Sequence, residues 1–150
     1  MVEDVHCAVT SMVMLVIAGA GGLKQILVDS GVSTYAGEVL SIIKISPLLL
    51  GWLIATLLRI TLGSATVAGI TAAGIVFPLV HTSGTSPELM TLAIGSGSLM
   101  TAHVNDGGFW LVKEYFNLSI KDTLRTWTVM ETCIGVSGLA GVLILNALLF

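Results

Sequence analysis

Residues 45–80 constrain the fold more than any other part of this 150-residue chain. As one straight helix, this stretch would extend about 54 Å at 1.5 Å per residue, whereas the hydrocarbon core of a bilayer is about 30 Å thick. The sequence is apolar over residues 48–58 and 67–80, and polar groups and a glycine separate these two parts. We therefore predict two short helical arms that meet at a polar tip, as in a re-entrant hairpin or a discontinuous helix.

The predicted tip is a candidate binding site, because irregular backbone persists at membrane depth only where protein buries it or a water-filled cavity faces it. The tip contains Gly63, Ser64 and Thr66. Free N–H groups where the second arm begins add positive partial charge. Arg59 lies beside the tip, and its guanidinium suits a carboxylate, so we expect an anion contact there. The alternative is that Arg59 extends to the lipid headgroups.

Composition places the chain in a membrane. Apolar residues make up 55% and charged residues 10%, and the mean hydropathy is +0.99, whereas soluble proteins are about a quarter charged. The net charge of −3 comes without a basic run, so we expect the lipid bilayer, and no nucleic acid, as a partner. The two cysteines form no metal-binding or redox motif, and we expect neither a metal nor a cofactor.

The pattern predicts an all-α, polytopic membrane protein over residues 1–150. Its candidate elements are 5–28, a broken hairpin at 45–80, an interrupted helix at 88–116 and a full span at 128–150. A connector at 29–44, a turn-rich loop at 81–87 and a polar loop at 117–125 separate them. Glu3 and Asp4 stand where a cleavable signal would have basic residues. Both ends are apolar, as expected of a piece cut from a longer protein.

A second candidate site lies within the interrupted helix, at residues 101–108, TAHVNDGG. His103, Asn105 and Asp106 gather between two apolar halves, and polar groups at such depth usually bind a substrate or relay protons. Gly107 and Gly108 permit the chain to unwind. We expect Thr101 and the residues after it to line a site.

Two residues of this segment are candidates for proton coupling. Asp106 is the only acid in either predicted break, and burial of a carboxyl disfavours its charged form. His103 can titrate near neutral pH. The alternatives are structural: Asp106 accepting backbone N–H bonds near the glycines, and His103 in a fixed hydrogen bond. Glu131, in the last predicted span, either couples to protons or lies at the membrane interface near Trp127.

No catalytic residues are predicted. Serine, histidine and aspartate all occur, but the GxSxG turn that exposes a nucleophilic serine is absent from the sequence. The AGAGG run at 18–22 lacks the spacing of a nucleotide-binding loop. We therefore expect that the protein is not an enzyme.

Three segments carry a resemblance to a known family: 18–32 (AGAGGLKQILVDSGV), 63–80 (GSATVAGITAAGIVFPLV) and 85–136, which begins TSPELM. The chain resembles the C-terminal third of the gluconate permease (GntP) family of bacterial inner-membrane gluconate:proton symporters. The resemblance covers nearly the whole chain, and NDGGFW at 105–110 is its most specific part. Family members are considerably longer and contain an inverted repeat, of which this chain resembles the second half.

The resemblance implies an ion-transporter superfamily-like half repeat, in which a hairpin tip and an unwound helix surround one substrate. It implies proton-coupled transport of gluconate or a related sugar acid across the bacterial inner membrane by a multi-pass protein. The missing N-terminal repeat, or a second copy, would be a partner. The substrate-binding residues would be Arg59, Gly63, Ser64, Thr66, Thr101, Asn105, Asp106, Gly107 and Gly108.

One departure and one alternative accompany this resemblance. Where the superfamily often has Ser-Asn-Thr, this chain has Ser64, Ala65 and Thr66, which favours a proton over sodium. Because half of the site is absent, the alternative is a small membrane protein that does not transport and packs against another subunit, or a remnant of a permease.

The basic residues predict the orientation. Lys113, Lys121 and Arg125 cluster around residues 117–125, while the loop at 81–87 has neither Lys nor Arg, so we expect the former to be cytoplasmic and the C-terminus to be external. A reporter that is active only in the periplasm should be active when it is fused after Phe150. An inactive fusion there, with an active one at Asn117, would reverse this orientation.

Overall fold

The computed structural model describes residues 45–149 and, before them, residues 10, 11, 14, 15, 18, 19, 22, 25, 26 and 29–31. The predicted element at 5–28 and the connector at 29–44 therefore lie largely outside the described residues. The described part consists of helices and loops and contains no strand. The all-helical prediction is confirmed for this part of the chain.

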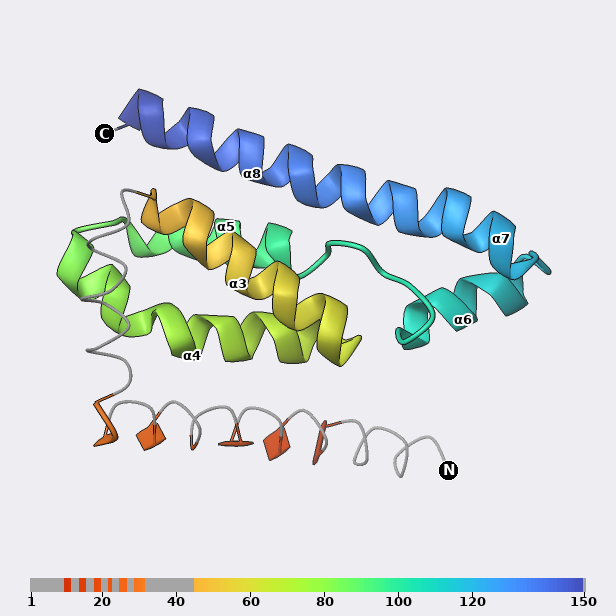
Figure 1. Cartoon of the computed structure of the whole chain (residues 1–150), viewed down its shortest axis with the longest axis horizontal. Helices are drawn as coiled ribbons and strands as arrows, with labels where there is room; N and C mark the ends of the chain where they lie inside the picture. Colours follow the sequence, from red (N-terminus) through yellow and green to blue (C-terminus); the bar gives the residue numbers. More distant parts are fainter. Residues whose placement is uncertain are drawn as a thin grey trace.

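Helices α3 (Pro47–Leu62) and α4 (Ala65–Ser83) fold back on each other in a hairpin (Figure 1). Gly63, at φ 73°, ends α3, and its N–H donates to the Arg59 carbonyl at 3.0 Å. Ser64 then caps α4 by accepting a hydrogen bond from the Val67 N–H at 3.4 Å. At 1.5 Å per residue the helices extend about 24 and 28 Å, so neither arm exceeds the hydrocarbon thickness. That the hairpin is re-entrant stays a prediction.

Helix α4 continues past the predicted end of the hairpin at residue 80. It runs to Ser83, and Gly84, at φ 67°, ends it. The loop predicted at 81–87 is therefore reduced to a short turn, because a left-handed glycine, and not the first polar residue, stops the helix.

Helix α5 (Pro87–Gly97) and helix α6 (Gly107–Tyr115) are separated by non-helical residues 98–106. The interruption predicted at 101–108 thus begins three residues earlier, at Ser98. Gly107 and Gly108 do not belong to the unwound part, because Asp106 is the N-cap of α6 and its side chain accepts the Gly108 N–H. We call residues 98–106 the α5–α6 segment.

The final helix is continuous over Ile120–Leu149. It comprises α7 (Ile120–Thr123), the π-helical turn η1 (Leu124–Thr128) and α8 (Val129–Leu149). The polar loop predicted at 117–125 is therefore wrong from Ile120 onward, and the last helix starts well before residue 128. Ser119 is the reason, since its hydroxyl oxygen accepts the Asp122 N–H at 3.1 Å and starts the helix early.

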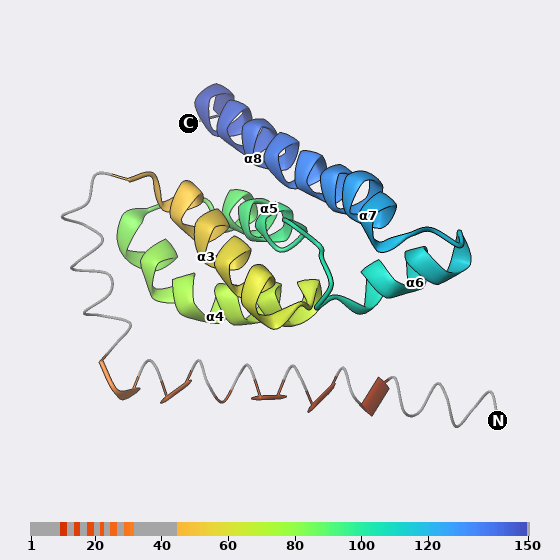
Figure 2. The ribbon, with the colours of Figure 1, turned by 45° about the vertical axis from the view of Figure 1, so that its right-hand side comes forward.

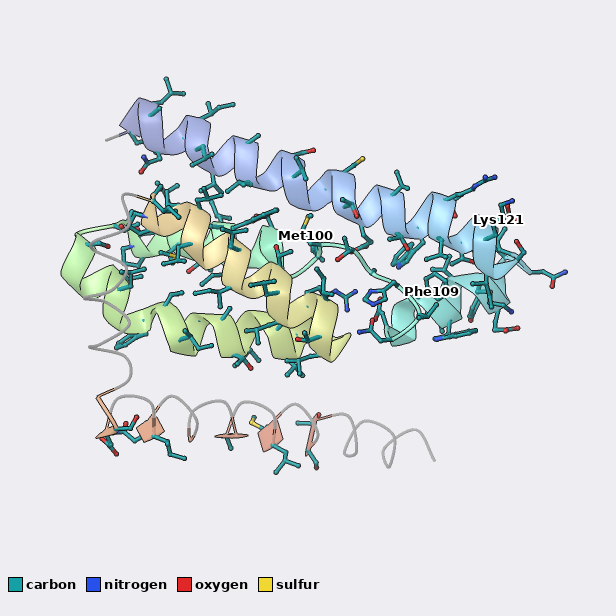
Figure 3. The ribbon with its side chains drawn as sticks, viewed as in Figure 1. Met100, Phe109 and Lys121 are labelled. Carbon is teal, nitrogen blue, oxygen red and sulfur yellow. The ribbon has the colours of Figure 1, made fainter. Side chains whose placement is uncertain are left out.

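This helix supports the membrane assignment. Its most apolar window has a mean hydropathy of 2.0, and among the described residues it is the one helix long and apolar enough to cross a membrane. Its 30 residues extend about 45 Å, so its charged first turns, with Lys121 and Arg125, can lie outside the hydrocarbon. Lys121, one of the basic residues that predict the orientation, lies at the start of this helix (Figure 3).

The helices pack through small residues. Helix α3 packs against α4 and α5, and α8 lies along α5 (Figures 1 and 2). A methyl group on Gly97 would lie 2.5 Å from the Trp52 carbonyl oxygen and 3.0 Å from the Ala55 side chain. The Trp52 indole N–H crosses to α8 and donates to the Gly135 carbonyl at 3.1 Å. Such close approach of backbones is typical of membrane helices.

This packing predicts different effects for two glycines of the same helix. Gly97→Ala should lower the free energy of unfolding by about 1–3 kcal/mol, because its methyl group overlaps a backbone that cannot move aside. Gly95→Ala is the matched control, since no atom lies within 4 Å of its added methyl group, and it should be neutral or stabilising. Unfolding by SDS in mixed micelles, followed by circular dichroism, measures both. Equal effects would contradict the α3–α5 packing.

Candidate functional site

A buried ion pair joins the hairpin to the α5–α6 segment. Arg59, in the last turn of α3, is 3% exposed, and its Nη2 lies 2.8 Å from Oδ2 of Asp106. The negative end of the α3 dipole favours a cation at this position, and a charge removed from water requires a partner. Two predicted site residues that are 47 positions apart are thus in direct contact.

The Asp106 carboxylate also holds helix α6. Its Oδ1 accepts the Gly108 N–H at 3.1 Å, while Oδ2 accepts from Arg59. The structural alternative for Asp106, hydrogen bonding to backbone N–H near the glycines, is therefore present together with the ion pair. Any change at Arg59 acts on the start of α6 through this one carboxylate.

A second contact joins the hairpin tip to the same segment. The Asn105 Nδ2 donates to the carbonyl of Ile60 at 2.8 Å, which satisfies one of the carbonyls left open at the end of α3. Gly63 lies so close to Asn105 that a side chain at Gly63 would overlap the Asn105 backbone carbonyl. Glycine is required here both for φ 73° and for this approach. The two breaks predicted from sequence are therefore adjacent in the structure.

The other predicted tip residues, Ser64 and Thr66, are not part of the ion pair. The Ser64 hydroxyl is half-buried and is used as the cap of α4. Thr66, in the first turn of α4, is exposed. Both lie where α4 begins, close to Gly63, and neither contacts Asp106 through a hydrogen bond that the structure records.

The remaining predicted residues lie along the α5–α6 segment and at the start of α6. Thr101 is half-buried and has φ 49°, an unusual conformation for a β-branched residue. The Nδ1 of His103 lies 2.8 Å from the Thr101 carbonyl oxygen, so His103 folds onto its own segment. Gly107 is exposed and Gly108 half-buried.

Two residues of the last helix, Glu131 and Trp127, lie near this site. The sequence predicts the membrane interface for Trp127, and either the interface or proton coupling for Glu131. Glu131 interacts electrostatically with Arg59 and Asp106. The indole N–H of Trp127 is buried and has no hydrogen-bond partner among the described residues. The sequence does contain one signal: Trp127 and Glu131 are four positions apart, and such positions lie on the same face of a helix. Nothing in the neighbouring sequence indicates that this face is directed toward Arg59.

The cluster can hold an additional anion. Arg59 uses Nη2 for Asp106, while its buried Nε and Nη1 have no partner in the described part of the chain. These are charged N–H donors, which form short, strong hydrogen bonds with carboxylates. The arrangement therefore offers charged N–H donors beside a carboxylate that already accepts two hydrogen bonds.

An apolar cavity of about 460 Å³ lies elsewhere, between the second half of α4 and the start of α5. Its lining includes Val76, Phe77, Met90 and Ile94, and it contains no charged residue. Because a buried anion requires charged or N–H donors, this cavity does not suit the chemistry that Arg59 offers.

Comparison with known sequences identifies relatives over nearly the whole chain. A sequence model of the family described as GntP family permease matches residues 2–148. The high-affinity gluconate transporter of Escherichia coli K12 is 56% identical over 138 residues, which are 92% of this chain and 32% of the transporter. The Gnt-II system L-idonate transporter of the same organism is 55% identical over 139 residues, or 93% and 32%.

A relative from another organism also matches most of the chain. The gluconate permease of Bacillus subtilis 168 is 48% identical over 135 residues, which are 90% of this chain and 30% of that permease. The chain therefore spans about a third of the length of the curated relatives it matches. No solved structure matches the chain.

The ion pair predicts strong coupling between its two residues. Arg59→Gln and Asp106→Asn should each lower the free energy of unfolding by about 3 kcal/mol, because each leaves a buried charge without its partner. The double variant should lose clearly less than the sum. SDS unfolding of the four proteins gives the coupling energy.

The pair between Lys113 and Glu114 is the matched control, because its side chains are 23% and 73% exposed. Lys113→Gln and Glu114→Gln should change stability by about 0.5 kcal/mol or less. Additive losses at Arg59 and Asp106, equal to those of the control pair, would exclude a stabilising ion pair.

Proposed function

The chain belongs to the GntP family of permeases, and on that premise we propose that it forms the C-terminal third of a secondary transporter for gluconate or a related sugar acid. The relatives named for gluconate and for L-idonate are about equally similar to it, so the substrate class is a hydroxylated carboxylate. In this proposal the protein lies in the bacterial inner membrane as part of a multi-pass assembly.

One observation carries the proposal: the buried Arg59 has guanidinium N–H groups without a partner in the described part of the chain, beside the two breaks in the helices. The substrate carboxylate accepts a hydrogen bond from the free N–H groups of Nη1. Gly63, Ser64 and Thr66 of the tip, with Thr101, Asn105, Gly107 and Gly108, line the same site. In this proposal the hairpin is re-entrant, and the two breaks meet near the bilayer midplane, where secondary transporters bind their substrates.

Charge balance supports coupling to a proton. Arg59 and Asp106 form a pair without net charge, so a substrate carboxylate adds an uncompensated negative charge. In a site of low dielectric constant like charges disfavour each other. A proton taken up by Asp106 cancels this added charge and is carried with the anion. Asp106 is thus the proposed proton carrier, and His103 and Glu131 are the other titratable candidates.

Transport requires the part of the permease that this chain lacks. The decisive experiment joins the chain to the N-terminal two thirds of the Escherichia coli gluconate transporter, in a strain without gluconate uptake. Saturable uptake of labelled gluconate should appear only when both parts are present, and Arg59→Gln should abolish it. If both parts accumulate in the membrane without uptake, the chain is a non-transporting membrane protein that packs with another subunit.

If Asp106 carries the proton, its substitution should separate two activities of that assembly: substrate exchange and accumulation driven by a pH gradient. Asp106→Asn keeps the shape and the hydrogen bond to the Gly108 N–H but cannot release a proton. Substrate should still exchange between the two sides, whereas a pH gradient should no longer drive accumulation. Vesicles with imposed pH gradients measure both activities.

Glu131→Gln and His103→Gln are the comparison variants, and both should retain accumulation. Accumulation that survives in Asp106→Asn and is lost in one of the other two would assign the carrier to that residue.

A further inference from the structure

All the buried polar side-chain atoms without a partner belong, within the described part of the chain, to three residues. They are Nε and Nη1 of Arg59, Oγ1 of Thr101 and Nε1 of Trp127. Native proteins keep few such atoms, because each loses its hydrogen bond to water without replacement. Arg59 is fixed to the α5–α6 segment by Asp106, and Thr101 is part of that segment. The third residue, Trp127, lies in the π-helical turn of the last helix.

The last helix brings Trp127 to the same segment. Its neighbour Thr128 donates a hydrogen bond to the carbonyl of Ala102, the residue after Thr101. One turn further on, Glu131 interacts electrostatically with Arg59 and Asp106. The α5–α6 segment runs between the last helix and the hairpin tip in both views of the fold (Figures 1 and 2). The unpaired atoms thus come from the α5–α6 segment and from the two elements on either side of it.

Trp127 differs from the other tryptophans of the chain. The indole N–H of Trp52 donates to the Gly135 carbonyl at 3.1 Å, and that of Trp110 donates to the Val104 carbonyl at 2.8 Å. Both of these have a structural function within the fold. The Trp127 N–H is withdrawn from water but has no acceptor among the described residues, and an indole N–H can only donate. An acceptor from outside the described chain would complete it.

Thr101 is also unusual, both in its backbone conformation and in its unpaired hydroxyl. A β-branched residue at φ 49° is strained, and its hydroxyl makes no hydrogen bond that would compensate. Glycine or asparagine would adopt this conformation more easily. The π-helical turn that contains Trp127 is also irregular, and such turns occur frequently at functional sites.

We infer that Trp127 Nε1 and Thr101 Oγ1 bind hydroxyl groups of a polyhydroxylated carboxylic acid whose carboxylate is held by Arg59. This inference rests on the proposed function and adds to it the residues that recognise the hydroxyls. The N–H of Trp127 donates to one hydroxyl oxygen, and Thr101 can donate to or accept from another. An acid without hydroxyls would leave these buried groups unpaired, which is how a polar site rejects such an analogue.

The test uses the reassembled permease with three matched variants: Trp127→Phe, Trp52→Phe and Trp110→Phe. Each removes one indole N–H and keeps an aromatic ring. Trp127→Phe should raise the KM for gluconate about tenfold, as expected for loss of one hydrogen bond in a buried site. The other two should leave KM within about twofold, whatever they do to the amount of protein in the membrane.

Singly deoxygenated gluconates identify the contact. One of them should be transported with the same KM by the wild type and by Trp127→Phe, because it lacks the hydroxyl that the indole N–H binds. If Trp127→Phe raises KM equally for every analogue, or not at all, the hydroxyl contact is excluded. A loss of assembly with the N-terminal part, at unchanged KM, would assign the Trp127 N–H to that part and also overturn the inference.

A second variant tests the site independently of packing around Trp127. Thr101→Gly removes the hydroxyl and the strain together, so it should raise KM about tenfold without lowering stability in SDS unfolding. Thr101→Ser keeps the hydroxyl and should raise the KM less than Thr101→Gly does. An assembly in which even the wild type shows no uptake would overturn the proposed function and this inference with it, whereas uptake with unaffected variants overturns the inference alone.

Discussion

The burial of one guanidinium organises the described part of this protein. Arg59 lies in an apolar bundle at 3% exposure, and a charge in such surroundings is stable only with a compensating partner. Asp106 is that partner, and it can reach Arg59 only because α5 ends at Gly97 and the chain runs as an irregular segment to α6. The ion pair therefore requires the break between α5 and α6, and it fixes where α6 begins.

The break in the hairpin depends on the same neighbourhood. Where α3 ends, its last carbonyls lack helical partners, and Asn105 satisfies the one at Ile60. Gly63 permits this approach because it carries no side chain. Adjacent residues of one segment, Asn105 and Asp106, thus neutralise the charge and complete the backbone hydrogen bonds at the end of α3.

The sequence predicts local features well and contacts between distant residues poorly. Gly63, Ser64 and the polar run at 101–108 indicate the two breaks, and Arg59, Asn105 and Asp106 stand out singly as polar groups in apolar surroundings. Their pairing does not follow from the sequence, because the spacing of 47 residues between Arg59 and Asp106 carries no periodic signal. The start of the last helix was misplaced because charged residues suggest a loop, whereas Ser119 caps a helix whose charged side chains are exposed. The π-helical turn has no sequence signature, so the burial of the Trp127 N–H was not foreseeable.

The same residues that stabilise the breaks limit what the site can bind. Asp106 and Asn105 use their acceptor and donor groups within the protein, and the Ser64 hydroxyl caps α4. Among the buried side-chain atoms of the described residues, the N–H groups of Arg59 and Trp127 and the hydroxyl of Thr101 have no partner, so these buried groups are almost entirely donors. Such a set favours a ligand with oxygen acceptors and a negative charge over an apolar molecule. Since Asp106 holds both Arg59 and the first turn of α6, protonation of this carboxylate would weaken the ion pair and the helix cap together. In the proposed transporter, substrate charge, proton uptake and the position of α6 would therefore be linked through a single carboxyl group.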